Sequence, residues 1–128
     1  MAKAAQIEER AMDYAIRAVH FFRYLKSKRD DVGSIIGRQY LRAATSVGAN
    51  LVEARSGESK KDFVHKCSIA QKETRESLCW LQLAARIELV PPNRLTPLIN
   101  ETNEILAVIT TIIRNAKLRL ARRPPQDK

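Results

Sequence analysis

The chain has 128 residues and a formal net charge of +9, and aromatic residues make up only 5% of it. This length predicts one domain with a hydrophobic core that needs no disulfide or metal, and the scarcity of aromatic residues favours helices over a sheet-rich fold. No apolar run approaches the roughly 20 residues that span a bilayer, and residues 1–14 lack the apolar core of a secretory signal, so we expect a cytoplasmic protein.

The first predicted helix runs to about Ser27. Its apolar residues recur at steps of three and four, which is typical of one buried helical face. The segment KSKRDDVGS that follows is polar and contains glycine, so it reads as a loop, and Ser34 is a suitable cap for the next helix. The predicted buried face consists of Ile7, Ala11, Tyr14, Ala18, Phe22 and Leu25.

The second predicted helix spans residues 35–55 and has two neighbouring apolar stripes, which indicates burial on more than one side. Small residues such as Gly37, Ala44 and Gly48 would let other backbones approach closely, although a glycine inside a helix costs about 1 kcal/mol relative to alanine. Both tight core packing and a contact between subunits are compatible with this pattern. One stripe is Ile36, Tyr40, Ala43, Val47, Asn50 and Ala54, and the other is Leu41, Ala44, Gly48 and Leu51.

The third predicted helix begins at the capping-box-like segment Ser59 to Asp62 and ends at Pro91 and Pro92. One face is mainly apolar, and a second face includes the carboxylates Glu73 and Glu76. Cys67 and Cys79 fall on this helix roughly 18 Å apart by the helical rise, which is too far for a disulfide. We expect both cysteines to act as small buried hydrophobic residues.

The fourth predicted helix begins at Asn93 or at Thr96, where Thr96 would cap it and Pro97 is tolerated in the first turn. Apolar residues repeat every seven positions along it, as in long helices that pack nearly parallel or antiparallel. The sequence therefore predicts an all-α fold, an antiparallel up-down-up-down four-helix bundle of residues 1–123, followed by a mobile tail at 124–128. The two seven-residue series are Leu98, Ile105 and Ile112, and Ile99, Leu106, Ile113 and Leu120.

Five polar residues on or beside the apolar stripes are predicted to form a structural network between helices. A buried polar group needs a partner, because leaving it unpaired costs a few kcal/mol. We therefore expect replacement of Glu76 or Asn50 by alanine to cost about 2 kcal/mol or more. The five residues are Arg42, Ser46, Asn50, Glu53 and Glu76.

Catalytic chemistry has little support in the sequence. Glu53, Glu73 and Glu76 could favour a carboxylate metal site, but such sites in bundles use Glu-x-x-His motifs, and His20 and His65 lie in none. The serines have no adjacent histidine in a recognisable motif, and no glycine-rich phosphate loop is present. We expect a protein that is not an enzyme and that needs no metal or other cofactor.

The positive charge gathers at the carboxyl end. After Val90 there are seven Lys or Arg residues and only three acids. Such a cluster can bind phosphates, although cations are also favourable at the negative pole of a helix without any ligand. Tyr24 and Tyr40 are candidate stacking groups, but we interpret Tyr40 as a core residue because it falls on an apolar stripe. The candidate nucleic-acid contacts are Arg114, Lys117, Arg119, Arg122 and Arg123.

Several ordered blocks resemble a known family. These are RAATSVGANLVEA at residues 42–54, SKKDF at 59–63 and IAQKETRE at 69–76, with Trp80 and Leu81 after them. The segment resembles the four-helix bundle proteins named after intervening sequences of bacterial 23S ribosomal RNA genes. The chain departs from the common pattern at Cys79, where many relatives have an aromatic residue.

The resemblance implies a small cytosolic bacterial protein that assembles into a ring-like homopentamer. One branch of that family looks like an accessory factor of diversity-generating retroelements, in which a basic pentamer binds a reverse transcriptase and nucleic acid. Our leading hypothesis is thus a homo-oligomeric bundle whose basic surface contacts RNA or DNA, with a reverse transcriptase or another protein as a candidate partner and no membrane contact. The alternative is a protein-only scaffold or adaptor whose charge serves solubility.

Overall fold

The computed structural model describes residues 2–122, which form four α-helices, one short 3-10 helix and no strand. The predicted boundary at residue 123 and the predicted tail at 124–128 lie outside the described residues. No helix in residues 2–122 is both long enough and apolar enough to cross a membrane. The elements are α1 (Ala2–Ser27), α2 (Asp31–Arg55), α3 (Lys60–Arg86), η1 (Pro92–Arg94) and α4 (Thr96–Ala121).

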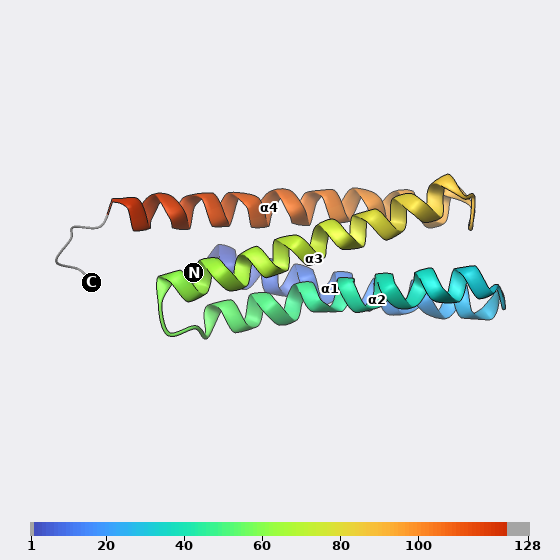
Figure 1. Ribbon diagram of the computed structural model, residues 1–128, viewed down its shortest axis with the longest axis horizontal. Helices are drawn as coiled ribbons and strands as arrows, with labels where there is room; N and C mark the ends of the chain where they lie inside the picture. The colour runs from blue at the N-terminus through green and yellow to red at the C-terminus, as the bar shows by residue number, and fades with distance from the viewer. Residues whose placement is uncertain (1, 123–128) are drawn as a thin grey trace.

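All four helices lie along the long axis of the molecule (Figure 1). The connections α1–α2 and α3–α4 lie at one end, and the α2–α3 connection lies at the other end beside the carboxyl end of α4 (Figure 1). Each helix packs mainly on its neighbour in sequence, while α1 and α4 touch over a smaller surface. The carboxyl end of α4 is therefore next to the loop between α2 and α3.

Side-chain caps mark the starts of α2 and α3. Ser59 caps α3 as predicted, and its hydroxyl accepts a hydrogen bond from the Asp62 N–H at 3.0 Å. The start of α2 was predicted wrongly, because Asp30 rather than Ser34 caps it and accepts from the Val32 N–H at 3.0 Å. This earlier start buries Gly33, where an added Cβ would lie 3.4 Å from Leu89. Packing against the α3–α4 connection thus favours the longer helix.

Helix α3 ends at Arg86, before the two prolines that were expected to end it. Glu88 takes a left-handed conformation with φ of 53°. Its N–H bonds the Ala85 carbonyl, and the Leu89 N–H bonds the Ala84 carbonyl, as in a Schellman motif. Helix α4 begins at Thr96, one of the two predicted starts, but Leu95 rather than Thr96 occupies the cap position.

The core lies along the inner faces of the helices and contains two fully buried tyrosines. Tyr40 packs edge-on against Tyr14 and Phe21, with ring centroids 6.3 Å and 5.8 Å away, which confirms its place in the core. Phe21 rather than the predicted Phe22 is the buried phenylalanine of α1. The other predicted residues of that face are buried: Ile7, Ala11, Tyr14, Ala18 and Leu25.

Three hydroxyl side chains lie in this core. Thr74, Ser77 and Thr102 are fully buried, and each donates to a carbonyl four residues earlier in its own helix. Because these bonds form within one turn, the hydroxyls can be buried without a partner on another helix. The Thr102 hydroxyl also contacts the Tyr14 hydroxyl of α1 at 2.5 Å.

Candidate nucleic-acid interface

The basic end of α4 is an exposed surface. Arg114, Lys117, Arg119 and Arg122 are all exposed, and within residues 2–122 none of them forms an ion pair. Arg123, the fifth predicted contact, lies outside the described residues. Helix α4 extends beyond the α2–α3 connection at this end (Figure 1). The four described side chains are therefore open to a ligand.

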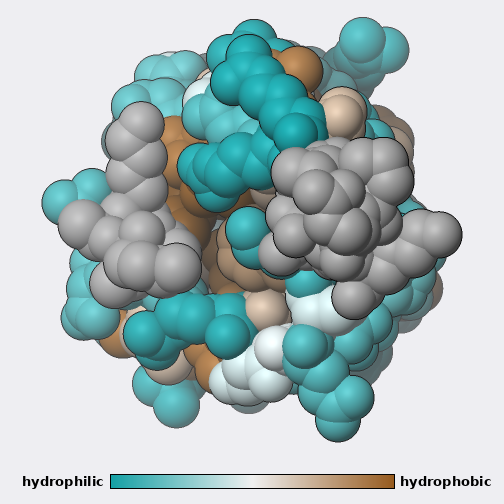
Figure 2. All heavy atoms as spheres, turned by 90° about the vertical axis from the view of Figure 1, so that its left-hand side faces the viewer, coloured by the Kyte–Doolittle hydropathy of each residue, from teal (hydrophilic) through white to brown (hydrophobic). Residues whose placement is uncertain are grey.

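Arg119 shares a hollow of about 310 Å³ with residues of the α2–α3 connection. The hollow contains two further cations, Arg55 and Lys60, and one acid, Glu58. Figure 2 shows hydrophilic side chains gathered around this end, with hydrophobic atoms visible between them at the centre. Sequence reasoning missed Lys60, because the segment that contains it was interpreted only as a helix cap.

Arg55 is already engaged by an acid of α1. Its Nε lies 2.6 Å from Oε2 of Glu8, and its Nη2 donates to Oε1 of Glu8 at 3.1 Å. Since this pair neutralises Arg55, Arg119 and Lys60 are the cations of the hollow without an ion pair in the described part of the chain. The positive charge without an ion pair at this end therefore centres on α4 and the first turn of α3.

The five polar residues proposed for an interhelical network do not form one connected network. Only Arg42 and Glu76 bond to each other across helices, as an ion pair between α2 and α3. Glu73, which was not among the five, lies 3.8 Å from the same guanidinium and is the more buried carboxylate, at 13% exposure against 33% for Glu76. This cluster lies at the surface, because 54% of the Arg42 side chain is exposed.

The other three residues bond elsewhere. Asn50 donates to the Ser46 carbonyl and Ser46 to the Arg42 carbonyl, both at 2.8 Å within α2, and Glu53 accepts from Lys66 of α3 at 2.8 Å. None of these groups is a buried charge whose partner a substitution would remove. The structure therefore lowers the expected cost of replacing Glu76 or Asn50 to about 1 kcal/mol or less.

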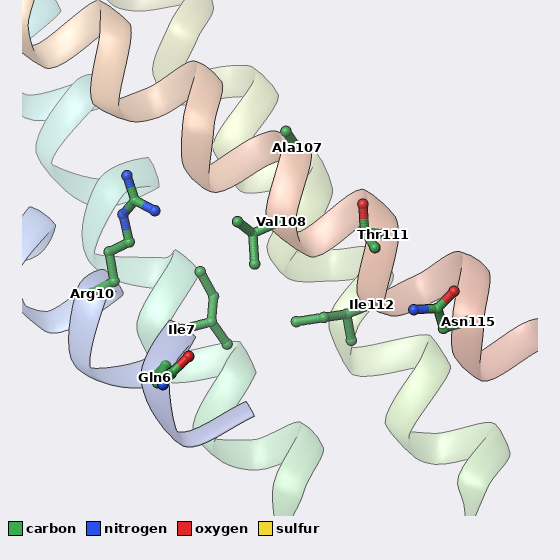
Figure 3. A pocket seen from close by; sticks show the side chains of 8 residues that line it. All are labelled: Gln6, Ile7, Arg10, Ala107, Val108, Thr111, Ile112 and Asn115. Carbon is green, nitrogen blue, oxygen red and sulfur yellow. The ribbon is translucent and has the colours of Figure 1, made fainter. Parts of the chain in front are cut away.

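A groove of about 380 Å³ separates α1 from α4. Figure 3 shows Ile7 of α1 and Val108 and Ile112 of α4 pointing into the space between the two helices. Thr111 and Asn115 stand along the α4 side (Figure 3). The groove is consistent with the small contact between α1 and α4, and it is mainly apolar, so it does not resemble a phosphate site.

An ion-pair cluster joins α1 to α4 beside this groove. Nε and Nη2 of Arg10 donate to the two carboxylate oxygens of Glu101 at 2.7 Å and 2.8 Å, and Nη2 also donates to Glu104 at 3.0 Å. The hydrogen bond from Arg10 holds the pKa of the Glu101 carboxyl below its ordinary value. This bidentate ion pair helps to set the position of α4 relative to α1.

Among the described residues, the metal-binding residue types do not cluster, and the two cysteines differ in burial. Within residues 2–122, no group of three or more His, Cys, Asp and Glu side chains could hold a metal ion. Both cysteines are free. Cys67 is buried, and burial raises the pKa of its thiol to about 11. Cys79 is exposed, so the prediction that both cysteines are buried is wrong for Cys79.

Comparison with known proteins identifies relatives of this fold. The family model described as 23S rRNA-intervening sequence protein matches residues 3–111. A crystal structure of a protein of unknown function from the S23 ribosomal protein family of Bacteroides thetaiotaomicron VPI-5482 is similar, with 31% sequence identity and a TM-score of 0.81. The match covers 88% of this chain and 98% of that one. No curated protein matches the chain.

Proposed function

Because the chain belongs to the family of 23S rRNA-intervening sequence proteins, we propose that it is a non-enzymatic, homo-oligomeric bundle that binds nucleic acid through the basic end of α4. The observation that supports this most directly is the group of exposed cations at Arg114, Lys117, Arg119 and Arg122, which have no ion-pair partner among the described residues. Unpaired cations on a protein of net charge +9 release counterions from RNA or DNA when they bind it.

The assembly that we propose is a pentamer of up-down-up-down bundles in the cytoplasm. A pentamer of the 14.5 kDa chain would have a mass of 72.5 kDa. Light scattering or native mass spectrometry measures this directly, and a monomer mass at micromolar concentration would contradict it. A nucleic-acid enzyme such as a reverse transcriptase is a candidate partner of the assembly.

Binding to labelled RNA and DNA across a salt series tests the proposal. On duplex DNA, the logarithm of the binding constant falls as the logarithm of the salt concentration rises, and each phosphate contact adds about 0.9 to the magnitude of this slope. Replacing Lys117, Arg119 and Arg122 by alanine should weaken binding and lower this slope by up to about 2.7. The oligomer mass should stay unchanged.

A charge-matched control separates a local interface from diffuse attraction. Lys72, Arg75 and Arg86 are exposed cations of α3 that form no ion pair within residues 2–122. Replacing these three by alanine removes the same charge and should affect binding less. Equal effects of the two triple variants would contradict the α4 interface, and absent or salt-insensitive binding by the wild-type protein would contradict nucleic-acid binding altogether.

A second candidate function is a protein-only scaffold or adaptor. It is favoured by four exposed apolar side chains at the adjoining ends of α2 and α3: Val32, Ile35, Leu83 and Ile87. The ion pairs Glu53–Lys66 and Arg42–Glu76 support the proposed antiparallel arrangement of α2 and α3. In that arrangement Ile35, two turns before Arg42, falls near Leu83, two turns after Glu76. A stoichiometric protein retained by the wild-type chain in nuclease-treated extract, and lost when Ile35 and Leu83 are replaced by serine, would favour this function.

A further inference from the structure

A second hollow lies near the end of the bundle opposite the carboxyl end of α4. It has a volume of about 340 Å³ and lies between α1 and the start of α4, toward the connection that joins α3 to α4 (Figure 1). Its lining combines an apolar floor with a rim of nitrogen-bearing side chains. The lining residues are Ile16, Arg17, His20, Phe21, Arg94 and Leu98.

Arg94 is held in place by a tyrosine of α1. Its guanidinium carbon lies 3.9 Å from the centroid of the Tyr24 ring, and Nζ of Lys28 lies 5.0 Å from the same centroid. A guanidinium stacked on an aromatic face is restrained as a flat plate. The contact with Tyr24 therefore restrains the exposed guanidinium of Arg94 at the edge of the hollow.

The nitrogen-bearing side chains of the rim are available to a ligand. Arg17, His20 and Arg94 are exposed, and in the part of the chain that the structure describes none of them forms an ion pair. Glu101 is within electrostatic range of Arg17, but its two carboxylate oxygens already accept from Arg10. An anion at the rim would thus meet positive charge that no carboxylate has neutralised.

The floor adds an apolar surface. Phe21 and Leu98 are buried beneath the hollow, and Ile16 remains 49% exposed at its side. A free phosphate would use the rim and leave this floor in water. A ligand with a flat apolar part and an attached anion would use both, and an unpaired nucleotide has this composition.

We propose that this hollow binds an unpaired nucleotide of single-stranded nucleic acid, with the base stacked on the Arg94 guanidinium and the backbone phosphate at Arg17 and His20. Unstacked bases lie on aromatic rings or arginine planes in many single-strand complexes, whereas the paired bases of a duplex are not free to do so. The inference rests on the proposed nucleic-acid function and adds a preference for unpaired strands to it. The α4 surface, which contacts phosphates, would bind both forms.

The test compares binding of the full-length protein to labelled oligouridylate and to an RNA duplex of equal length, by fluorescence anisotropy. Arg94→Lys keeps the charge but removes the plane, and we expect it to weaken single-strand binding about fivefold or more and duplex binding less than twofold. Arg86→Lys, on the exposed last turn of α3, is the matched control and should leave both unchanged. Equal single-strand binding by the two variants would overturn the proposal.

A second variant pair tests the apolar floor independently. Ile16→Glu places a carboxylate in the hollow and should weaken single-strand binding more than duplex binding. Met12→Glu introduces the same charge one turn earlier on α1, at a side chain that is 58% exposed and outside the hollow. If both changes weaken single-strand and duplex binding equally, the floor is not a binding surface and the proposal fails.

The outcomes separate this site from the α4 interface. Loss of binding in the α4 triple variant, together with no specific effect of Arg94→Lys, would support the proposed function and overturn the nucleotide site. Absence of binding to either RNA by the wild-type protein would overturn both. Circular dichroism of each variant confirms that the helices are intact.

Discussion

Replacing Thr102 by valine removes the acceptor of a buried hydrogen bond between α1 and α4. Thr102 is 0% exposed and Tyr14 is 1% exposed. The single hydroxyl proton of Thr102 goes to the Leu98 carbonyl at 2.6 Å, so the Tyr14 hydroxyl must be the donor in the 2.5 Å contact between the two side chains. Valine removes this acceptor from the buried Tyr14 hydroxyl, whose other polar neighbours are the hydroxyls of Ser77 and Tyr40, and the free energy of unfolding should fall by about 2 kcal/mol.

Tyr14→Phe removes the donor instead and should cost about 1 kcal/mol, because Thr102 keeps its bond to Leu98. The double variant removes both partners and should cost little more than Tyr14→Phe alone. The two single effects should therefore exceed the double effect by about 2 kcal/mol, a coupling typical of residues in contact. Urea melts of all four proteins at one protein concentration measure this, since the melting of an oligomer depends on concentration. Additive effects would refute the assigned hydrogen-bond direction.

Tyr40→Phe should change the free energy of unfolding by no more than about 1 kcal/mol, because the buried Tyr40 hydroxyl has the Tyr14 hydroxyl as a polar neighbour but makes no hydrogen bond of normal geometry within residues 2–122; a larger loss in a urea melt would contradict this. The ion pair with Arg10 lowers the pKa of Glu101. The pair therefore stabilises the fold fully at a pH above the ordinary glutamate pKa, and this stabilisation is lost as the pH falls through the lowered pKa of the folded protein. Glu101→Gln should therefore flatten the loss of stability as the pH falls below the ordinary glutamate pKa, and parallel wild-type and variant curves would contradict this. An aromatic disulfide reagent should label the exposed Cys79 in the native protein and the buried Cys67 only after unfolding. Equal labelling of both thiols in the native protein would contradict this.

Local patterns were sufficient to predict the four helices. The spacing of Ile7, Ala11 and Tyr14 marks a buried face, and the Ser59 hydroxyl caps α3, because both effects depend on residues within a few positions of one another. The start of α2 was less predictable, since Asp30 and Ser34 can both cap a helix. The choice between them depends on the packing of Gly33 against Leu89, which is distant in sequence.

The candidate sites depended more strongly on the tertiary structure. The exposed cations of α4 were predictable because they cluster within one helix. The partners of Arg42, Glu53 and Asn50 were not, because a stripe on one helix does not specify which side chain of the next helix lies opposite. Glu73 shares a guanidinium with Glu76 only because α2 and α3 pack in one particular register.

By itself, the sequence determined the helical class, the family blocks and the basic carboxyl end, since periodicity, capping and charge are properties of short segments. Only the tertiary structure placed Arg94 on the ring of Tyr24 and brought Arg119 beside Lys60. It also joined Tyr14 to Thr102 inside the core. These contacts join residues from different helices, and their geometry follows from how buried faces pack, which no local pattern of residues encodes.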